Sequence, residues 1–499
     1  MKLNNLSPNK IKKLSLNDTY KLSKSIRDFL IETNSITGGH IGANLGVVEL
    51  SIAMHRVFNS PKDSFFFDTG HIGYTHKIIT GRAKLFNTLN NYKGLNRFLT
   101  PDESKHDKIE ASHAGTAIST ALGNAICEKL NSSKNLTVAV VGDGALCEGI
   151  SLEALNHASK EKVNLLIIIN DNGYAISKGF GAINDILSSR KNNSKQFFNL
   201  LGYKTIGPID GHNLRELENT FKNYIKNKGV QLIHIKTNKG QGYKHADESS
   251  NKMHFSMPFY KNTGKLKNNS AGKSIQNFAT DIIESYMHKN KKILCITPST
   301  RYATDLDRIF DKFKDRCFDP GMTEQHALSL ANGFAIKGYL PVVFYQSTFL
   351  QRSFDQLIHD VSFANKNVLI LSVRSGFAGY DNATHHGIYD ISYLKGIPNL
   401  KIIYPENIKS MQKYISDYFK KPSGPTCILF PYGFEKDYLF KSENLNKIKK
   451  NNSAIITLGN TLGHCLDIQK ELRNSGIQIN IFTIERIKPL NKNKLLNIS

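Results

Sequence analysis

Short apolar runs rich in Val, Ile and Leu alternate with helix-like stretches along most of the chain, and this alternation limits the possible folds more than any other feature. In the first half the runs are DSFFFD, LTVAVVGD, VNLLIIIND and VQLIHIKT. In the second half they are KKILCITPS, LPVVFYQS, NVLILSVRS, LKIIYPE and TCILFPY. Strands buried on both faces of a parallel sheet have this near-continuous apolar character, and helices connect them. The pattern predicts an α/β protein with consecutive open, mainly parallel sheets flanked by helices.

Two polar stretches divide the chain. Residues 245–275 are rich in Gly, Ser and Asn, which is typical of a linker, and a lysine-rich stretch, SENLNKIKKNNS, follows at 442–453. A chain of 499 residues can hold two or three domains. We therefore expect α/β domains at 1–265 and 276–440, and a partial α/β domain at 450–499 that begins a strand, helix and strand unit and then stops.

Charge and cysteine content exclude some classes of protein. The 66 Lys and Arg residues exceed the 42 Asp and Glu residues, for a net charge of +24. An anionic substrate, or a genome that favours lysine throughout its proteins, can account for this excess. Nucleic-acid binding is not expected, because no basic run is interleaved with aromatic residues. The six cysteines form no CxxC pair, and no apolar run is long enough for a signal peptide or a membrane span. We expect a cytoplasmic protein without a membrane partner.

Polar groups follow two neighbouring apolar runs where each predicted strand ends. Asp143 stands between Gly142 and Gly144, and Asn172 lies 29 residues further on. Ligands of parallel sheets bind at the carboxyl ends of strands, and a carboxylate with an amide oxygen suits Mg²⁺ and its bound phosphates. The alternative is a tight turn in which Asp143 caps the next helix. The spacing favours a thiamin-diphosphate and Mg²⁺ site, with the backbone carbonyl of Tyr174 completing the ligands.

Longer segments carry a family resemblance. They are ITGGHIGANLGVVELSIAMH from residue 36, FFFDTGHIGYTHKIITGR from 65, FDPGMTEQHALSLANGFA at 318–335, STFLQRSFDQLIHDVSFAN at 347–365 and GYDNATHHGIYDISYLKGIPN from 379. With these, nearly the whole chain resembles the 1-deoxy-D-xylulose-5-phosphate synthase family of transketolase-like enzymes. The resemblance implies a diphosphate-binding first domain, a pyrimidine-binding second domain and a homodimer. It also implies the decarboxylative condensation of pyruvate with D-glyceraldehyde 3-phosphate.

The resemblance also implies a role for individual residues. Glu324 is expected to hydrogen-bond the aminopyrimidine of thiamin diphosphate, although a glutamate at a helix start can also be favoured by the helix dipole alone. A lone histidine is more often structural, and His254 lies in the linker-like stretch. The implied residues are, for catalysis, Glu324, His40 and His385; for the cofactor, His71, His113, Gly144, Ala145, Asn172, Phe349 and His254; for the acceptor, Arg352, Arg374 and Asp381; for the metal, Asp143, Asn172 and Tyr174.

The sequence departs from the family pattern at several acceptor and cofactor positions. Tyr432 in FPYGFE takes the place of an arginine, and Gln346 takes the place of a tyrosine. Ala114 and Gly115 replace two hydroxyl residues, and Glu248 lies near a missing lysine. These changes leave a second hypothesis open, a related carboligase with a different aldehyde acceptor that need not be phosphorylated. A catalytically inactive binding partner is a third, and the intact Asp143, Asn172 and Glu324 disfavour it.

Overall fold

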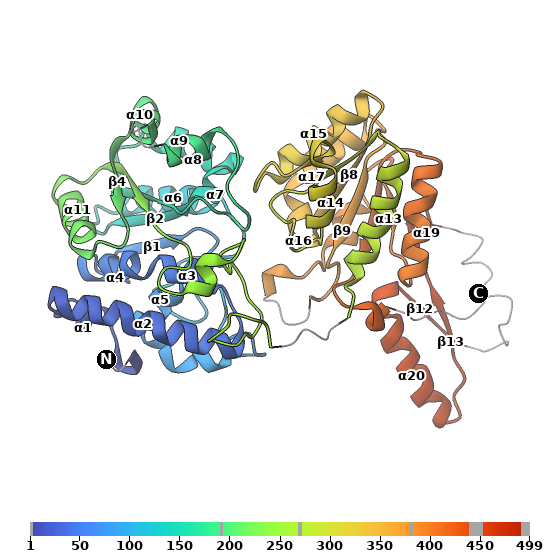
Figure 1. The fold of residues 1–499 in the computed structure, drawn as a ribbon, viewed down its shortest axis with the longest axis horizontal. Coiled ribbons are helices and arrows are strands. Elements are labelled where there is room, and N and C mark those ends of the chain that lie inside the picture. The colour runs from blue at the N-terminus through green and yellow to red at the C-terminus, as the bar shows by residue number, and fades with distance from the viewer. Residues whose placement is uncertain (1–2, 190–192, 268–271, 379–382, 439–452, 491–499) are drawn as a thin grey trace. The chain divides into compact units, whose positions relative to one another are not determined.

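The computed structural model describes residues 3–189, 193–267, 272–378, 383–438 and 453–490. The chain divides into two compact units, Met1–Asn268 and Asn269–Ser499 (Figure 1). The division falls inside the linker predicted at 245–275. Each unit has its own sheet and core. The three-domain division proposed from the sequence stays a prediction.

The first unit is built on a parallel five-stranded sheet with the strand order β1-β2-β3-β5-β4. The strands are β1 Ser64–Phe67, β2 Thr137–Gly142, β3 Leu165–Asp171, β4 Lys204–Asp210 and β5 Val230–Lys236. The four predicted runs form β1, β2, β3 and β5. The edge strand β4 escaped prediction because Gly207 and Pro208 interrupt its apolar pattern, and its register with β5 shifts between Ile206 and Ile209.

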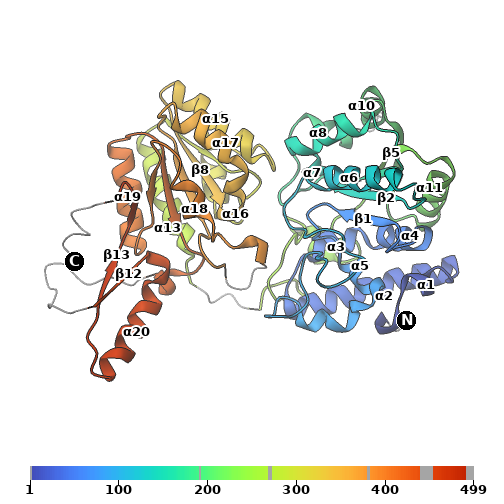
Figure 2. The same cartoon turned by 180° about the vertical axis from the view of Figure 1, so that it is seen from behind.

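Helices cover both faces of this sheet (Figures 1 and 2). Alternate side chains of the strands, such as Val138 and Leu166, pack in one core with α2, α4 and α11, while Ala139 and Ile167 are buried on the other face. The helices are α1 Pro8–Ile11, α2 Leu16–Thr37, α3 Ile41–Gly46, α4 Val48–Val57, α5 Tyr74–Lys77, α6 Ala117–Leu130, α7 Asp143–Leu146, α8 Gly149–Ala158, α9 Ala182–Ser188, α10 Asn193–Leu200, α11 Leu214–Asn227 and α12 Lys244–Glu248.

The second unit contains a seven-stranded sheet with the order β14-β10-β11-β9-β8-β6-β7. All neighbouring pairs are parallel except β10 and β14. The strands are β6 Ile293–Ile296, β7 Cys317–Phe318, β8 Leu340–Gln346, β9 Leu369–Val373, β10 Lys401–Ile403, β11 Thr426–Phe430 and β14 Arg486–Lys488. The five predicted runs form β6, β8, β9, β10 and β11. The short β7 and β14 carry too few residues to show a strand pattern.

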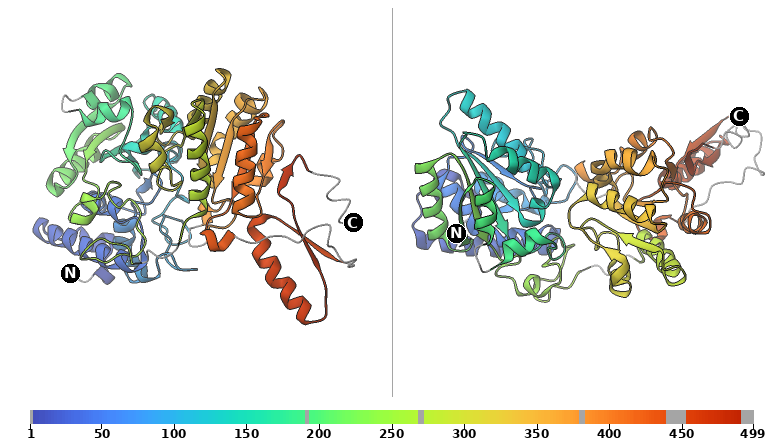
Figure 3. Two further views of the ribbon diagram at one scale, coloured as in Figure 1. Left: turned by 45° about the vertical axis from the view of Figure 1, so that its right-hand side comes forward. Right: turned by 90° about the horizontal axis from the view of Figure 1, so that it is seen from above.

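Helices α13 and α19 pack side by side on one face of this sheet, and α15 packs on the other (Figure 3). The helices are α13 Ile275–Lys289, α14 Asp307–Lys312, α15 Glu324–Ile336, α16 Ser347–Leu350, α17 Phe354–Gln356, α18 Asp390–Leu394, α19 Ile408–Lys420 and α20 Leu462–Asn474. Near the C-terminus, β12 Ala454–Thr457 and β13 Asn480–Thr483 form a separate two-stranded parallel sheet, which α20 contacts. Among the described residues, no helix is long and apolar enough to cross a bilayer.

A buried carboxylate joins two strand ends of the second unit to α18. Asp390, the first residue of α18, accepts hydrogen bonds from Ser347 Oγ at 2.6 Å and from Ser375 Oγ at 2.8 Å. Ser347 follows β8 and Ser375 lies two residues after β9. Burial raises the pKa of Asp390 to about 6. The ionised form of Asp390 is therefore costly in the folded protein.

We predict that Asp390→Asn changes how stability depends on pH. The unfolded chain releases this proton near the ordinary aspartate pKa of about 3.9, whereas the folded chain keeps it up to about 6. The folded state therefore holds more protons between these values, and its stability falls as pH rises through this window. Asparagine cannot ionise, so the variant should lack this loss, roughly 2 kcal/mol between about pH 4.5 and pH 7.5. Urea unfolding across this range, with the exposed Asp315→Asn as control, measures it; parallel curves for wild type and Asp390→Asn would contradict the prediction.

Candidate functional site

The carboxylate of Asp143 is buried at the carboxyl end of β2 without a full hydrogen bond. The residue is 1% exposed, and neither carboxylate oxygen has a hydrogen-bond partner among the described residues. Burial, reinforced by repulsion from Asp171, raises the pKa of Asp143 to about 7. The N–H groups of Asp143 and Asn172 face the carboxylate and favour its anion, but neither completes a hydrogen bond. A buried acid in this state is suited to a cation.

The structure brings Asn172 to Asp143 through the pairing of β2 with β3. Gly142 is in register with Asn170, so the residues that follow both strands meet at one edge of the sheet. The side-chain Oδ1 of Asn172 accepts a hydrogen bond of 3.1 Å from the backbone N–H of Tyr174, which turns the chain there. Gly144 and Ala145 lie in α7 directly after Asp143. Asp143 and Asn172, whose side-chain oxygens are possible metal ligands, thus lie at the same edge of the sheet.

Open space adjoins these strand ends. A Cβ added at Gly142 or at Gly173 would meet no atom of the described part of the chain within 4 Å. Gly173 also has a φ of +75°, a conformation that glycine adopts without strain. The open space and the orphaned carboxylate of Asp143 fit a divalent cation with bound phosphates, as the sequence predicted. The residues present are therefore compatible with Mg²⁺ and a diphosphate.

Lys239 is a site residue that sequence reasoning missed. Its side chain is buried, and Nζ donates to the carbonyl of Ala175 and contacts His254 Nδ1 at 2.9 Å. Burial lowers the pKa of Lys239 to about 7, while the charge of Asp143 acts in the opposite direction. The lysine stands in the glycine-containing TNKGQGY stretch directly after β5, and this position after a strand is the signal that could have identified it.

Three of the predicted histidines gather in the first unit although they lie far apart in the sequence. The ring centroids of His40 and His71 are 5.4 Å apart, those of His40 and His254 are 5.5 Å apart, and those of His71 and His254 are 5.2 Å apart. The rings of Phe98 and Phe255 also contact that of His40, with ring centroids 5.3 Å and 5.2 Å away. Burial, followed by the charge of Lys239, lowers the pKa of His71 to about 3, so this imidazole is neutral near pH 7. Burial also lowers the pKa of His254. His71 and His254 therefore provide neutral hydrogen-bonding groups.

His113 lies in the segment that precedes α6, and a buried aspartate holds this segment. The carboxylate of Asp68 accepts hydrogen bonds from the N–H of Gly115 at 2.9 Å and 3.0 Å, and from the N–H of Ala117 at 3.2 Å. Ser151 Oγ donates to the carbonyls of Gly115 and Ala145. Through these contacts the backbone next to His113 is tied to the α7 region.

In the second unit, Glu324 is buried at the beginning of α15, with 4% of its surface exposed. Its backbone carbonyl accepts a hydrogen bond of 2.7 Å from the hydroxyl of Tyr345, which lies in β8. Burial and the charge of Glu324 raise the pKa of that hydroxyl. Glu324 lies at the start of a helix, as predicted from the sequence. The hydrogen bond from Tyr345 holds the backbone of the glutamate against strand β8.

The other predicted residues of this unit follow the carboxyl ends of the adjacent strands β8 and β9. Phe349 follows β8, and its ring contacts that of His385 at 5.6 Å. Thr348 Oγ1 donates to the carbonyl of Thr384 at 2.8 Å, which holds this pair of segments together. Arg352 lies half-buried in the turn after α16. The predicted Asp381 lies outside the described residues.

Arg374, directly after β9, contacts the aromatic residue that replaces the expected arginine. Its guanidinium lies over the ring of Tyr432 at 5.0 Å from the centroid, and its backbone has a φ of +64°. Tyr432 follows β11. Although Tyr432 replaces the expected arginine, the guanidinium of Arg374 still provides a cation here, stacked on the Tyr432 ring.

Comparison with known proteins adds to this geometry. Residues 3–196 and 189–237 match the family described as 1-deoxy-D-xylulose-5-phosphate synthase, and residues 272–433 match the transketolase pyrimidine-binding domain. Proteins named 1-deoxy-D-xylulose-5-phosphate synthase from Halothermothrix orenii and Macrococcus caseolyticus are 37% and 36% identical, covering 98% and 97% of this chain and 85% of each relative.

A further protein of that name, from Bacillus velezensis, is 35% identical over 97% of this chain and 84% of its own. Among solved structures, a transketolase from Campylobacter jejuni matches 96% of this chain and 90% of that chain, with 16% identity and a TM-score of 0.44. The sequence relatives match along almost the entire length of the chain and include both units. The chain therefore belongs to the 1-deoxy-D-xylulose-5-phosphate synthase family.

Proposed function

We infer that this protein condenses pyruvate with D-glyceraldehyde 3-phosphate, with loss of CO₂, to give 1-deoxy-D-xylulose 5-phosphate, and that it is a transferase that uses thiamin diphosphate and Mg²⁺. Family membership supports this reaction. The observation in the structure that carries it is the buried carboxylate of Asp143 beside Asn172, for which the described residues offer no hydrogen-bond partner. None of the relatives named above favours the alternative carboligase.

The residues of the first unit would hold the metal and the diphosphate. Asp143, the side chain of Asn172 and the carbonyl of Tyr174 are the proposed Mg²⁺ ligands, since hard oxygen donors suit this ion. The N–H groups of Gly144 and Ala145, at the first turn after β2, and the histidines 71, 113 and 254 would bind the diphosphate. When bound, thiamin diphosphate supplies a thiazolium carbon that can accept the charge left by departing CO₂.

Side chains of the second unit, together with His40 of the first unit, would orient the ring system and the acceptor. Glu324 is proposed to hydrogen-bond the aminopyrimidine nitrogen, and Phe349 to contact the ring. His40 and His385 are proposed to donate or accept protons at substrate oxygens, a task that suits imidazole near neutral pH. Arg352 and Arg374 are proposed to bind the acceptor phosphate, for which guanidinium is well suited. Asp381 is proposed to contact the acceptor as well.

The homodimer and the cytoplasmic location belong to the same proposal. The family resemblance supports the dimer. The six cysteines, all of which are free thiols in the structure, support a reducing compartment.

The reaction can be tested by incubating the purified chain with pyruvate, Mg²⁺ and thiamin diphosphate and a panel of aldehydes. We expect CO₂ release and 1-deoxy-D-xylulose 5-phosphate only when D-glyceraldehyde 3-phosphate is present, measured by trapped ¹⁴C label and by chromatography. Turnover with an unphosphorylated aldehyde together with none for D-glyceraldehyde 3-phosphate would refute the proposed acceptor and favour the alternative carboligase.

Asp143→Asn should weaken the binding of the cofactor with its metal. The amide keeps the shape of the side chain but removes the charge that a divalent cation needs. Loss of even an outer-shell partner lowers metal affinity by about 10- to 100-fold, so we expect a loss of at least roughly tenfold. Calorimetric titration with thiamin diphosphate and Mg²⁺ measures this, and the exposed Asp28→Asn on α2 is the control. Equal affinities of Asp143→Asn and wild type would remove Asp143 from the proposed site.

Glu324→Gln should separate catalysis from binding. Glutamine keeps the size of the side chain but cannot act as a carboxylate toward the ring nitrogen, and proton transfers of this kind contribute about 10²- to 10⁴-fold to rates. We expect kcat to fall at least roughly 100-fold, whereas metal-dependent cofactor affinity stays close to that of wild type. Steady-state kinetics and calorimetry on the same preparation check both points. A variant with an undiminished rate would refute the assigned role.

A further inference from the structure

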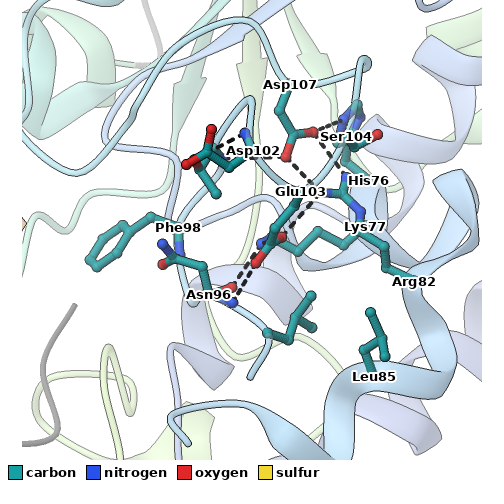
Figure 4. A network of polar contacts seen from close by, with 12 residues as sticks. His76, Lys77, Arg82, Leu85, Asn96, Phe98, Asp102, Glu103, Ser104 and Asp107 are labelled. Carbon is teal, nitrogen blue, oxygen red and sulfur yellow. Dashed lines mark hydrogen bonds and ion pairs between the residues drawn. The ribbon is translucent and has the colours of Figure 1, made fainter. Parts of the chain in front are cut away.

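A network of charged side chains, most of them buried, ties the loop of residues 96–107 to the rest of the first unit (Figure 4). Glu103 accepts hydrogen bonds from the backbone N–H of Asn96, at 2.5 Å, and from Lys77 Nζ. Lys77 Nζ also donates to the backbone carbonyl of Asn96 at 2.7 Å. Both backbone polar groups of Asn96 are therefore held by one ion pair, whose lysine side chain is fully buried.

A second carboxylate anchors the other end of the loop. Asp107 accepts hydrogen bonds from Arg82 Nη1 at 2.6 Å and Nη2 at 2.9 Å, a two-pronged geometry, and it contacts His76 Nε2 at 3.0 Å. Arg82 Nη1 also reaches Glu103 at 3.2 Å, which links the two anchors. His76 and Lys77 belong to α5, so the loop is attached to that helix and to the turn after it.

The held segment forms part of the surroundings of His40. The N–H of Phe98 donates to the side-chain Oδ1 of Asn96 at 2.9 Å, and the Phe98 ring contacts His40 at 5.3 Å. The guanidinium of Arg97 lies over the ring of Phe255 at 5.0 Å, and that ring contacts His40 at 5.2 Å. The two residues that follow Asn96 thus support both aromatic rings beside His40.

Burying charged side chains to hold a loop costs free energy, because the charges lose their hydration. Apolar side chains of similar volume often give equal or greater stability, so a buried ion pair is weak evidence for a role in stability alone. Its directional bonds do, however, fix the backbone of Asn96 in one position. Orientation of a reacting group to within a fraction of an ångström has large effects on rate.

We propose that Glu103 is a positioning residue: together with Lys77 it clamps Asn96, and through Phe98 and Arg97 this clamp sets the orientation of the His40 imidazole. The inference rests on the proposed function only for the part that His40 plays in the reaction. The packing of His40 can be measured without turnover.

The test compares Glu103→Gln with a matched control, Glu218→Gln. Glu218 is a buried carboxylate of the first unit, paired with Arg56 at 2.5 Å, and Arg56 binds the carbonyls of Ile11 and Leu14 near the N-terminus. Glu103 is partly buried, and its partner Lys77 is fully buried. Both substitutions remove the negative charge of an ion pair in the first unit. A purely structural role predicts similar effects of the two, whereas a positioning role predicts effects at His40 for Glu103→Gln alone.

The first readout is the rate at which diethyl pyrocarbonate modifies His40 in the full-length protein, followed by peptide mass spectrometry. His40 is 7% exposed in the structure, so its reactivity reports on the packing of Phe98 and Phe255. We expect Glu103→Gln to raise this rate severalfold and Glu218→Gln to leave it unchanged. Equal rates in the two variants would overturn the proposal.

The second readout is kinetic. We expect Glu103→Gln to lower kcat/KM by about tenfold or more, with cofactor affinity retained, and Glu218→Gln to retain the wild-type value. If the wild type shows no synthase turnover, the proposed function fails, and the labelling rates alone decide the positioning role. If Glu103→Gln does not fold, Phe98→Leu is the second variant. It keeps the clamp on Asn96 but replaces the ring beside His40 with a smaller side chain. This variant should then show the raised labelling rate, and an unchanged rate would overturn the proposal.

Discussion

The candidate site depends on the parallel pairing of β2 with β3, which brings an acid and an amide to one edge of the sheet and keeps the acid away from water. Gly142 pairs with Asn170, and the residues beyond them are Asp143 and Asn172. Burial disfavours the charge of Asp143, and the neighbouring Asp171 disfavours it further. Nothing within the described protein neutralises it by a hydrogen bond. A buried acid held in this way is less costly with a cation beside it, which is why this location suits a metal and its phosphates.

The histidine cluster illustrates how the first unit builds its site from separate segments. His40 directly precedes α3, His71 follows β1, and His254 lies after α12. Their imidazoles meet at ring distances near 5 Å, with Phe98 and Phe255 around His40. The loop that carries Phe98 is held by ion pairs that do not touch this cluster. The side chains proposed for catalysis and the charges proposed to orient them are thus different residues. Lys77 and Arg82 lie within the segment FFFDTGHIGYTHKIITGR, whereas Glu103 and Asp107 lie outside the segments that suggested the family.

The sequence predicted the parts of the fold that have a clear apolar pattern. The long runs became β2, β3, β5, β8 and β9, whereas β4 was missed because Gly207 and Pro208 interrupt it, and β7 because it has two residues. Asp143 and Asn172 could be paired from sequence because parallel strands end at the same edge of a sheet. Asp390 and Glu103 could not be recognised in this way. Their importance comes from contacts with residues of other segments, such as Ser347 and Asn96.

By itself, the sequence determined the α/β class, the alternating strands and helices, the family, and the pairing of an acid with an amide at two strand ends. These follow from local patterns, since hydrophobic periodicity and short motifs are written in consecutive residues. The tertiary structure alone decided which charges are buried and unpaired, which histidines share a cluster, and which ion pairs hold the loop beside His40. Burial and long-range contacts set these properties, and they depend on how distant segments pack against one another.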